Sequence, residues 1–135
     1  MSQRNQPHQQ NGKATELEIQ RILIEKGLIV SEPVRDCAYD LVVEVEGELI
    51  KTQIKRGYPS QSREGVLRVN LYRKSLINGI DKRPYKESEI DAFIIHNPSL
   101  EGEESIYWIW FEEAPDYEMK RTFDSLQKHQ LTEKI

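Results

Sequence analysis

The sequence has little of what secreted and membrane proteins depend on. It contains a single cysteine, Cys37, among 135 residues, which excludes an intrachain disulfide and any zinc site built from several cysteines. Its apolar runs are only a few residues long, and a bilayer-spanning helix needs about 20. Residues 1–11 hold no apolar segment of the kind that a signal peptide requires. We therefore expect an intracellular, cytoplasmic protein that has no membrane partner.

Length and composition indicate one folded domain. A chain of 135 residues is too short for two ordinary domains but long enough to bury one core. Hydrophobic residues make up 37% and charged residues 31% of the chain. The apolar residues cluster in periodic runs, which is typical of a globular protein and not of a disordered one.

The charge is divided unevenly along the chain. The net charge is −4, yet the window from Lys51 to Lys86 holds ten basic and two acidic residues and carries +8. The rest of the chain therefore carries −12. A basic window of this kind favours contact with a phosphate backbone. A solvated basic face without a partner is the alternative interpretation.

Apolar spacing predicts the order of the elements. Residues 1–11 are expected to form a flexible tail, and residues 12–26 a helix that Gly27 ends. The expected strands are residues 28–34, 39–45, 48–55, 66–72, 91–98 and 104–111. Residues 115–135 are expected to form a closing helix. This order predicts an α/β fold with a mixed β-sheet and flanking helices.

One carboxylate of the first helix lies on its apolar side. At about 100° per residue, Glu16 lies roughly 60° from Ile19 and opposite the charged stripe formed by Glu18, Arg21 and Glu25. A carboxylate facing the core is unfavourable unless it is paired or bound to a metal. A residue of the first helical turn, where the helix dipole favours negative charge, is the alternative.

A hairpin around Glu46-Gly47 brings further polar residues together. A two-residue loop places Asp40 opposite Gln53, and a shifted loop places it opposite Lys55. In both registers Asp40, Gln53 and Lys55 share one face of the sheet, because side chains alternate. A three-residue loop would break this arrangement. An ion pair on an exposed face is the alternative interpretation, and Asp36 and Asp91 are alternative carboxylates.

These residues resemble the PD-(D/E)XK nuclease superfamily. The similarity rests on Glu16, Tyr39-Asp40-Leu41 and Gln53-Ile54-Lys55. Its further motifs resemble the homing endonuclease branch associated with group I introns, and they are Gly12-x-x-x-Glu16, Pro33, Gly47, Gln53-x-Lys55-Arg56 and Asp91-Ala-Phe93. The resemblance implies a restriction-endonuclease-like core over residues 12–114.

The resemblance also implies roles for individual residues. Asp40, Glu16 and Gln53 would hold a divalent metal, most simply Mg²⁺, and Lys55 would act on the attacking water and the phosphate. Gln53 stands where most members of the superfamily have an acid. An amide oxygen coordinates without charge, so weaker metal binding or fewer metal ions is expected.

The expected function is cleavage of double-stranded DNA by a homo-oligomer, either a dimer or a tetramer, because cutting both strands requires two sites. A Holliday-junction resolvase and a non-catalytic DNA-binding module are the alternatives. The candidate DNA-binding residues are Lys51, Arg56, Arg63, Arg68, Arg73, Lys74 and Arg83. Tyr58, Tyr72 and Tyr85 are interleaved with them and are interpreted as packing residues.

Overall fold

A computed structural model describes residues 7–74 and 82–135, with side chains for residues 12–73 and 82–135. The helices are α1 (Pro7–Glu25), α2 (Phe123–Leu126) and α3 (Leu131–Lys134), with short 3₁₀ turns at Gly102–Ser105, Phe111–Glu113 and Gln127–His129. The strands are β1 (Ile29–Ser31), β2 (Leu41–Val45), β3 (Glu48–Pro59), β4 (Val66–Asn70), β5 (Tyr72–Lys74), β6 (Lys82–Pro84), β7 (Ala92–His96), β8 (Ile106–Trp110) and β9 (Glu118–Thr122).

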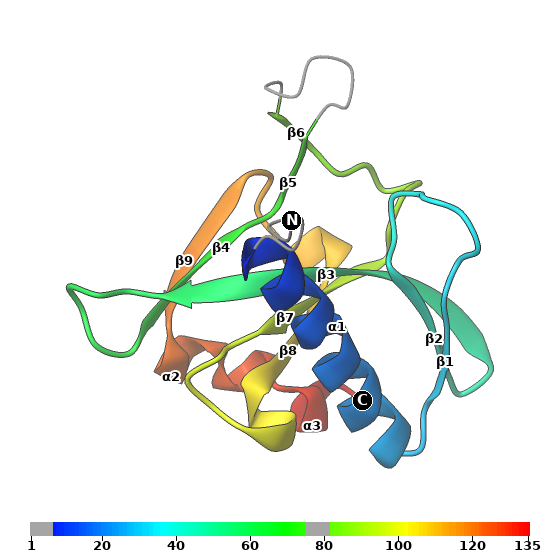
Figure 1. The fold of residues 1–135 in the computed structure, drawn as a ribbon, viewed down its shortest axis with the longest axis horizontal. Coiled ribbons are helices and arrows are strands. Elements are labelled where there is room, and N and C mark those ends of the chain that lie inside the picture. Colours follow the sequence, from blue (N-terminus) through cyan, green and yellow to red (C-terminus); the bar gives the residue numbers. More distant parts are fainter. Residues whose placement is uncertain (1–6, 75–81) are drawn as a thin grey trace, which may run out of the picture.

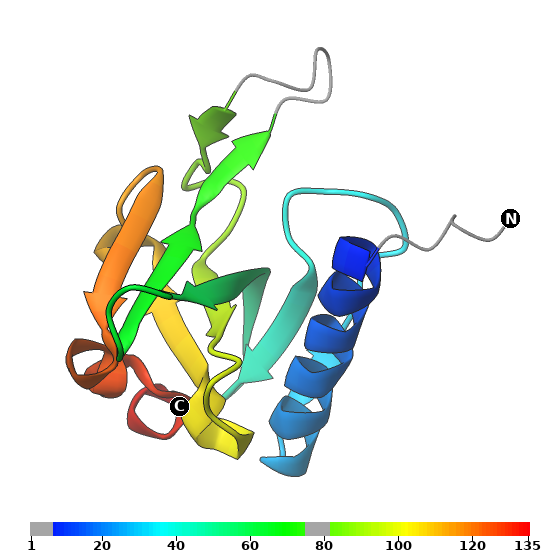
Figure 2. The ribbon, with the colours of Figure 1, turned by 60° about the vertical axis from the view of Figure 1, so that its left-hand side comes forward.

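Seven strands form one mixed sheet around the long strand β3. The antiparallel path runs β1-β2-β3-β4-β9, while β7 pairs with β3 in parallel and β8 pairs with β7. The remaining strands, β5 and β6, form a separate two-stranded ribbon that projects from the body of the molecule (Figures 1 and 2). The predicted α/β class, a mixed sheet with flanking helices, is confirmed.

The hairpin has the predicted two-residue loop. Pairing runs from Val45 opposite Glu48 to Leu41 opposite Thr52. Glu46 and Gly47 have φ values of 51° and 86°, and two successive positive φ values are typical of the turn that matches the twist of a β-hairpin. The loop therefore fixes the register on which the predicted sharing of one face by Asp40, Gln53 and Lys55 depends.

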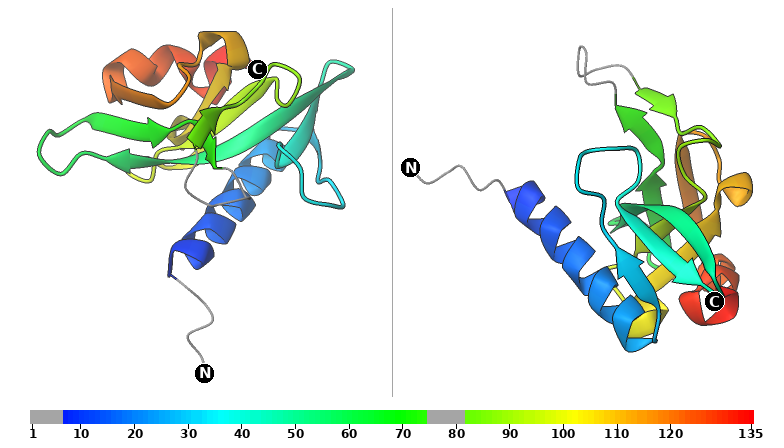
Figure 3. Two further views of the ribbon diagram at one scale, coloured as in Figure 1. Left: turned by 90° about the horizontal axis from the view of Figure 1, so that it is seen from above. Right: turned by 90° about the vertical axis from the view of Figure 1, so that its right-hand side faces the viewer.

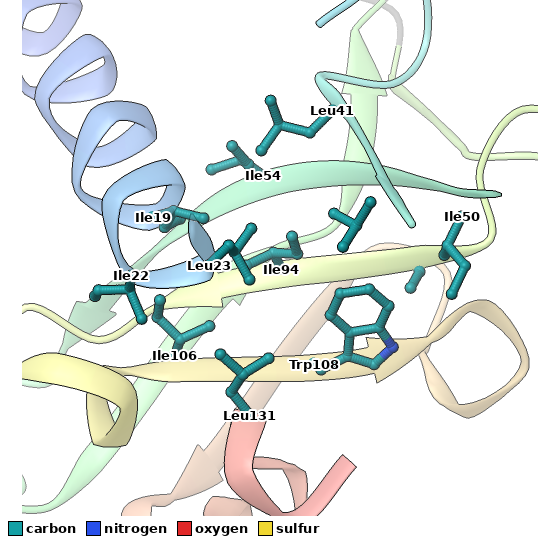
Figure 4. Packing of buried hydrophobic residues seen from close by; sticks show 12 residues of the cluster. Ile19, Ile22, Leu23, Leu41, Ile50, Ile54, Ile94, Ile106, Trp108 and Leu131 are labelled. Atoms are coloured by element: carbon teal, nitrogen blue, oxygen red, sulfur yellow. The ribbon is translucent and has the colours of Figure 1, made fainter. Parts of the chain in front are cut away.

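Two apolar clusters lie on the two faces of the sheet. The first joins Ile19 and Leu23 of α1 to Leu41, Ile94 and Trp108 of the sheet (Figure 4). The second lies on the other face, and its buried members include Leu67, Val69, Tyr85, Phe93 and Leu126. Helix α2 contributes Leu126 to the second cluster and lies on the other side of the sheet from α1 when the molecule is viewed from above (Figure 3, left), whereas Leu131 of α3 packs in the first cluster with α1.

Helix α1 is amphipathic as predicted but begins earlier. Ile19 and Leu23 are fully buried, whereas Arg21 forms exposed ion pairs with Glu18 and Glu25. The helix starts at Pro7, so the predicted tail over residues 1–11 is too long at its C-terminal end, and residues 1–6 lie outside the described residues. Glu16 therefore lies in the middle of the helix, which excludes the first-turn interpretation.

The prediction of a single helix over residues 115–135 is wrong. This segment begins with β9, which pairs with β4, and continues through α2 and α3. Met119 is buried on β9 between exposed neighbours, which is the alternation typical of a strand. Pairing at the edge of the sheet therefore outweighs the local helix propensity of this segment. In the part of the chain that the structure describes, no helix is long and apolar enough to cross a membrane.

Candidate active site

Asp40 lies directly before β2 and is fixed to the neighbouring strand. Its amide donates to the carbonyl of Thr52 at 2.8 Å, and its Oδ2 atom accepts from the amide of Ile54 at 3.0 Å. The side chain is half-buried. Burial raises the pKa of the Asp40 carboxyl, although the Ile54 amide and the nearby Lys55 partly oppose this rise. The carboxylate is thus held by the backbone of β3 and lies within electrostatic range of Lys55.

Lys55 lies on β3 and is also half-buried. Its Nζ atom donates to the carbonyl of Tyr72 at 3.1 Å and lies 5.0 Å from the centre of the Tyr85 ring. Burial lowers the pKa of the Lys55 amine to about 8, and the charge of Asp40 partly offsets this effect. At neutral pH the amine is therefore mostly protonated and can donate hydrogen bonds to a negatively charged group.

Glu16 reaches the same neighbourhood from α1. It lines a pocket of about 280 Å³ together with Lys13, Glu32, Asp36 and Asp40. Burial raises the pKa of the Glu16 carboxyl, and repulsion from Asp40 raises it further, whereas Lys13 lowers it. Two carboxylates that repel each other in one pocket form an arrangement that a cation would stabilise.

Gln53 lies two residues before Lys55, so both side chains point to the same side of β3. The Gln53 side chain is half-buried, and its Nε2 atom donates to the carbonyl of Ile54 at 3.3 Å. The amide nitrogen is therefore engaged with the backbone. The oxygen is the end of this side chain that could serve as a ligand for a cation.

This set of donors fits a hard divalent cation held by few protein ligands. The described residues contain no group of three or more histidine, cysteine, aspartate or glutamate side chains placed to hold a metal. Two carboxylates and one amide oxygen are the remaining candidates. Mg²⁺ prefers oxygen ligands and usually keeps several waters, so a site with two carboxylates suits it.

The alternative carboxylates have other surroundings. The Oδ2 atom of Asp91 accepts from the backbone amide of Lys51 at 2.9 Å, which ties the start of β7 to β3. Asp36 is exposed in the connection between β1 and β2 and lines the same pocket as Glu16 and Asp40. Asp91 thus has a structural partner, whereas Asp36 lies near the site.

The candidate DNA-binding residues that the structure describes differ in their partners. Arg73 and Arg83 both pair with Glu89 at the base of the β5–β6 ribbon. The Nζ atom of Lys51 donates to the carbonyl of Ser88 at 2.8 Å. Lys74 lies in β5, but its side chain lies outside the described part of the chain.

Arg56 lies on β3, Arg63 in the loop that follows it and Arg68 on β4. The guanidinium groups of Arg56 and Arg68 lie 5.9 Å and 5.7 Å from the centre of the Tyr58 ring. Arg63 is exposed in the loop that follows β3. Pairing places Lys120 of β9 opposite Arg68. Tyr58, Arg56, Arg68 and Lys120 therefore lie together on β3, β4 and β9.

Sequence reasoning missed two residues near the candidate site. Tyr85 was interpreted as packing, and its ring does pack edge-on against Phe93 at 5.5 Å, but it also contacts Lys55. Glu89 links Arg73 to Arg83 and was not identified. The basic and aromatic residues near them in the sequence indicated that this segment could be functional. The contacts themselves could not be predicted, because they depend on the path of the chain in space.

Comparison with known proteins identifies the family. The family model described as "PD-(D/E)XK endonuclease" matches residues 6–134. The chain belongs to the PD-(D/E)XK endonuclease family. The family match includes the segment after residue 114, so the predicted core over residues 12–114 is shorter than the matched region. No curated protein matches the chain.

A solved structure with the same fold supports this assignment. It is that of a bacterial homing endonuclease, I-Ssp6803I, with a TM-score of 0.59 and 23% sequence identity. The similarity covers 82% of this chain and 72% of that structure. At this level of identity the similarity establishes a shared fold, and this fold agrees with the restriction-endonuclease-like core that was predicted for this PD-(D/E)XK family member.

Proposed function

We propose that the protein is a Mg²⁺-dependent DNA endonuclease that cuts both strands of a duplex at specific sites, in the manner of a homing or restriction enzyme. The observation that carries the proposal is the placement of Glu16, Asp40 and Lys55. The charge of Asp40 influences the pKa of both other groups, so the three half-buried side chains share one electrostatic environment. They do so in a chain of the PD-(D/E)XK endonuclease family.

The cation would be held by Asp40, Glu16 and the amide oxygen of Gln53. When bound, Mg²⁺ lowers the pKa of a coordinated water and neutralises charge on the phosphate. The raised pKa of both carboxyl groups means that protons compete for the same oxygens, so cation binding weakens as the pH falls. The neutral amide of Gln53 adds a ligand without adding charge.

Lys55 would contact the phosphate or the attacking water. Its amine is held near Asp40 and is mostly protonated at neutral pH, which suits donation to a phosphate oxygen as negative charge develops there. Hydrolysis would break the phosphodiester bond and leave a 5′-phosphate and a 3′-hydroxyl. The hydrogen bond that the Asp40 carboxylate accepts from the amide of Ile54 and the burial of Lys55 keep the two groups in place.

Double-stranded DNA is the proposed substrate, and a homo-oligomer, either a dimer or a tetramer, is the proposed functional form. One chain of this size provides one set of these residues, and double-strand cleavage needs two. Among the candidate cations whose side chains the structure describes, Arg63 and Arg68 are the most exposed. They are suited to contact the phosphate backbone without first breaking a buried ion pair.

The test is cleavage of a mixed pool of plasmids in the presence and absence of Mg²⁺. We expect the wild-type protein to linearise specific plasmids, and Asp40→Asn and Lys55→Ala to lose this activity. Asp124→Asn, which changes an exposed carboxylate on α2, is the matched control and should cut normally. Retained cleavage in Asp40→Asn would contradict the proposed site.

Two other outcomes would favour the alternatives. Cleavage of four-way junctions with linear duplex left intact would indicate a Holliday-junction resolvase. Binding of DNA without any cleavage, with Mg²⁺ or Mn²⁺, would indicate a non-catalytic DNA-binding module. The specific observation that favours this module is the uncharged Gln53 in the place of an acid. Replacing it by Gln53→Glu and repeating the assay separates a weak metal site from an absent one.

A further inference from the structure

The base of the β5–β6 ribbon lies directly against Lys55. The Nζ atom of Lys55 donates to the carbonyl of Tyr72, the first residue of β5, at 3.1 Å. The same amine lies 5.0 Å from the centre of the ring of Tyr85, which directly follows β6. The lysine thus emerges from β3 and meets a backbone acceptor and an aromatic face that both belong to the ribbon.

Tyr85 is fixed in this position by its own packing. Its side chain is only 8% exposed, and its ring meets that of Phe93 edge-on with centroids 5.5 Å apart. Phe93 in turn pairs with Gln53 in the parallel register of β3 and β7. A ring held in this way presents a constant face to a cation, and such contacts gain strength when water is excluded.

An ion-pair cluster holds the ribbon in place. Glu89 accepts hydrogen bonds from Arg73 of β5, from Arg83 of β6 and from the backbone amide of Lys86. The carboxylate therefore joins both strands of the ribbon to the segment that leads into β7. The position of Tyr72 and Tyr85 relative to Lys55 is set by this cluster as well as by packing.

Asp40 belongs to the same electrostatic environment as Lys55 and Tyr85. The charge of Asp40 influences Lys55 and also Tyr85, whose pKa burial raises to about 12. The phenol of Tyr85 thus stays neutral at any working pH and does not compete with Asp40 for the positive charge of Lys55. This makes Tyr85 suited to direct the amine without taking part in proton transfer.

We propose that Tyr85, together with the main-chain carbonyl of Tyr72, positions the amine of Lys55 for the reaction, so that the base of the β5–β6 ribbon is part of the active site. Tyr85 is in this view a positioning residue that acts through Lys55. The inference rests on the proposed nuclease function, because positioning matters only if Lys55 takes part in cleavage.

The kinetic test compares two variants of Tyr85 on a plasmid that the wild-type protein cuts with Mg²⁺. Tyr85→Phe keeps the aromatic face and should cut at a rate within about twofold of wild type, whereas Tyr85→Leu should lose about tenfold or more in kcat with little change in KM. The control is Tyr117→Leu, which removes an exposed ring and should leave both constants unchanged. An unchanged kcat in Tyr85→Leu overturns the proposal.

A second readout does not depend on cleavage. In a proton–carbon NMR spectrum at one fixed pH, the ε-methylene signal of Lys55, assigned with Lys55→Arg, should be shifted upfield of the other lysines by the Tyr85 ring. The shift should persist in Tyr85→Phe and disappear in Tyr85→Leu. A signal at the ordinary lysine position in the wild type would overturn the proposed positioning. If the shift is present and no DNA is cut, the contact exists and the proposed nuclease function is what fails.

Discussion

Asp40 and Lys55 are linked through the backbone of β3, because the Oδ2 atom of Asp40 accepts a hydrogen bond from the amide of Ile54, the residue that precedes Lys55. This bond serves the fold and the candidate site together. It joins the residue before β2 to the middle of β3, and it holds the carboxylate near Lys55.

Substitution of Asp40 should separate these two roles. Asp40→Asn keeps an oxygen that can accept from Ile54, so its free energy of unfolding should stay close to that of wild type. Asp40→Ala leaves a partly buried amide without its partner and should cost about 1 kcal/mol. Both should reduce Mg²⁺-dependent cleavage by about 100-fold or more, because both lose the charged ligand. Urea unfolding and plasmid cleavage measure the two effects, and equal stability of both variants would contradict the structural role.

Local sequence signals were sufficient to predict the hairpin. The two residues of the Glu46-Gly47 turn fixed its geometry, and the turn then fixed the register that places Leu41 opposite Thr52. The apolar spacing of α1 placed Glu16 next to the buried Ile19 for a similar reason. In both cases the information lies within a few residues of the feature.

Features that depend on distant residues could not be predicted in the same way. Tyr85 meets Lys55 across 30 positions of the sequence, and the contact exists because β7 returns beside β3. The start of α1 was placed too late because residues 7–11 are polar and show no helical apolar period. The C-terminal segment has a helical pattern locally, but its first part pairs with β4 and becomes the edge strand β9.

The salt dependence of DNA binding should change more when Arg68 is replaced than when Arg73 is replaced. Arg68 is exposed and its ion pair with Glu118, at 3.6 Å, is open to solvent, so Arg68→Gln should lower the slope of log K against log salt by about one. Arg73 pairs with the less exposed Glu89, so Arg73→Gln should change this slope less. The measurement is a salt titration of binding to a labelled duplex with Ca²⁺ in place of Mg²⁺. The exposed Lys128→Gln is the control, and an unchanged slope in Arg68→Gln would remove Arg68 from the interface.

Glu89 should make the free energy of unfolding depend on pH in the acid range. Hydrogen bonds from Arg83 lower the pKa of the Glu89 carboxyl from its usual 4.5 to about 2 in the folded protein. A lowered folded pKa means that the stabilisation is complete above about pH 4.5 and is lost as the pH falls toward 2. Glu89→Gln should therefore be less stable than wild type by about 1 kcal/mol at pH 7, after allowance for solvent screening, and nearly equal to it at pH 2.

Urea unfolding of both proteins at several pH values checks this dependence. Glu87→Gln, which changes an exposed carboxylate in the same segment, should follow the wild-type curve throughout. A constant difference between Glu89→Gln and wild type across the pH range would mean that the ion pairs with Arg73 and Arg83 do not contribute to stability.

Residue 57 should have to be a glycine, because the side chain of Leu67 lies too close to leave room for a Cβ atom. Gly57 is two residues beyond Lys55 on β3. A Cβ atom at Gly57 would lie 2.6 Å from the Cδ2 atom of Leu67, whose side chain is fully buried. Gly57→Ala should therefore destabilise the protein by about 1–3 kcal/mol. Gly12→Ala is the matched control, since it adds the same methyl group where nothing lies within 4 Å, inside α1, and it should raise stability by about 0.5–1 kcal/mol.

A double-mutant cycle identifies the cause of the Gly57 effect. Leu67→Ala alone should cost about 2–4 kcal/mol because it leaves a cavity, and the new methyl group of Gly57→Ala would partly fill that cavity. The double variant should therefore be more stable than the sum of the two single effects by about 1 kcal/mol or more. Strictly additive effects would show that Gly57→Ala acts on the strand itself. In that case the steric contact with Leu67 would not explain why β3 carries a glycine so close to Lys55.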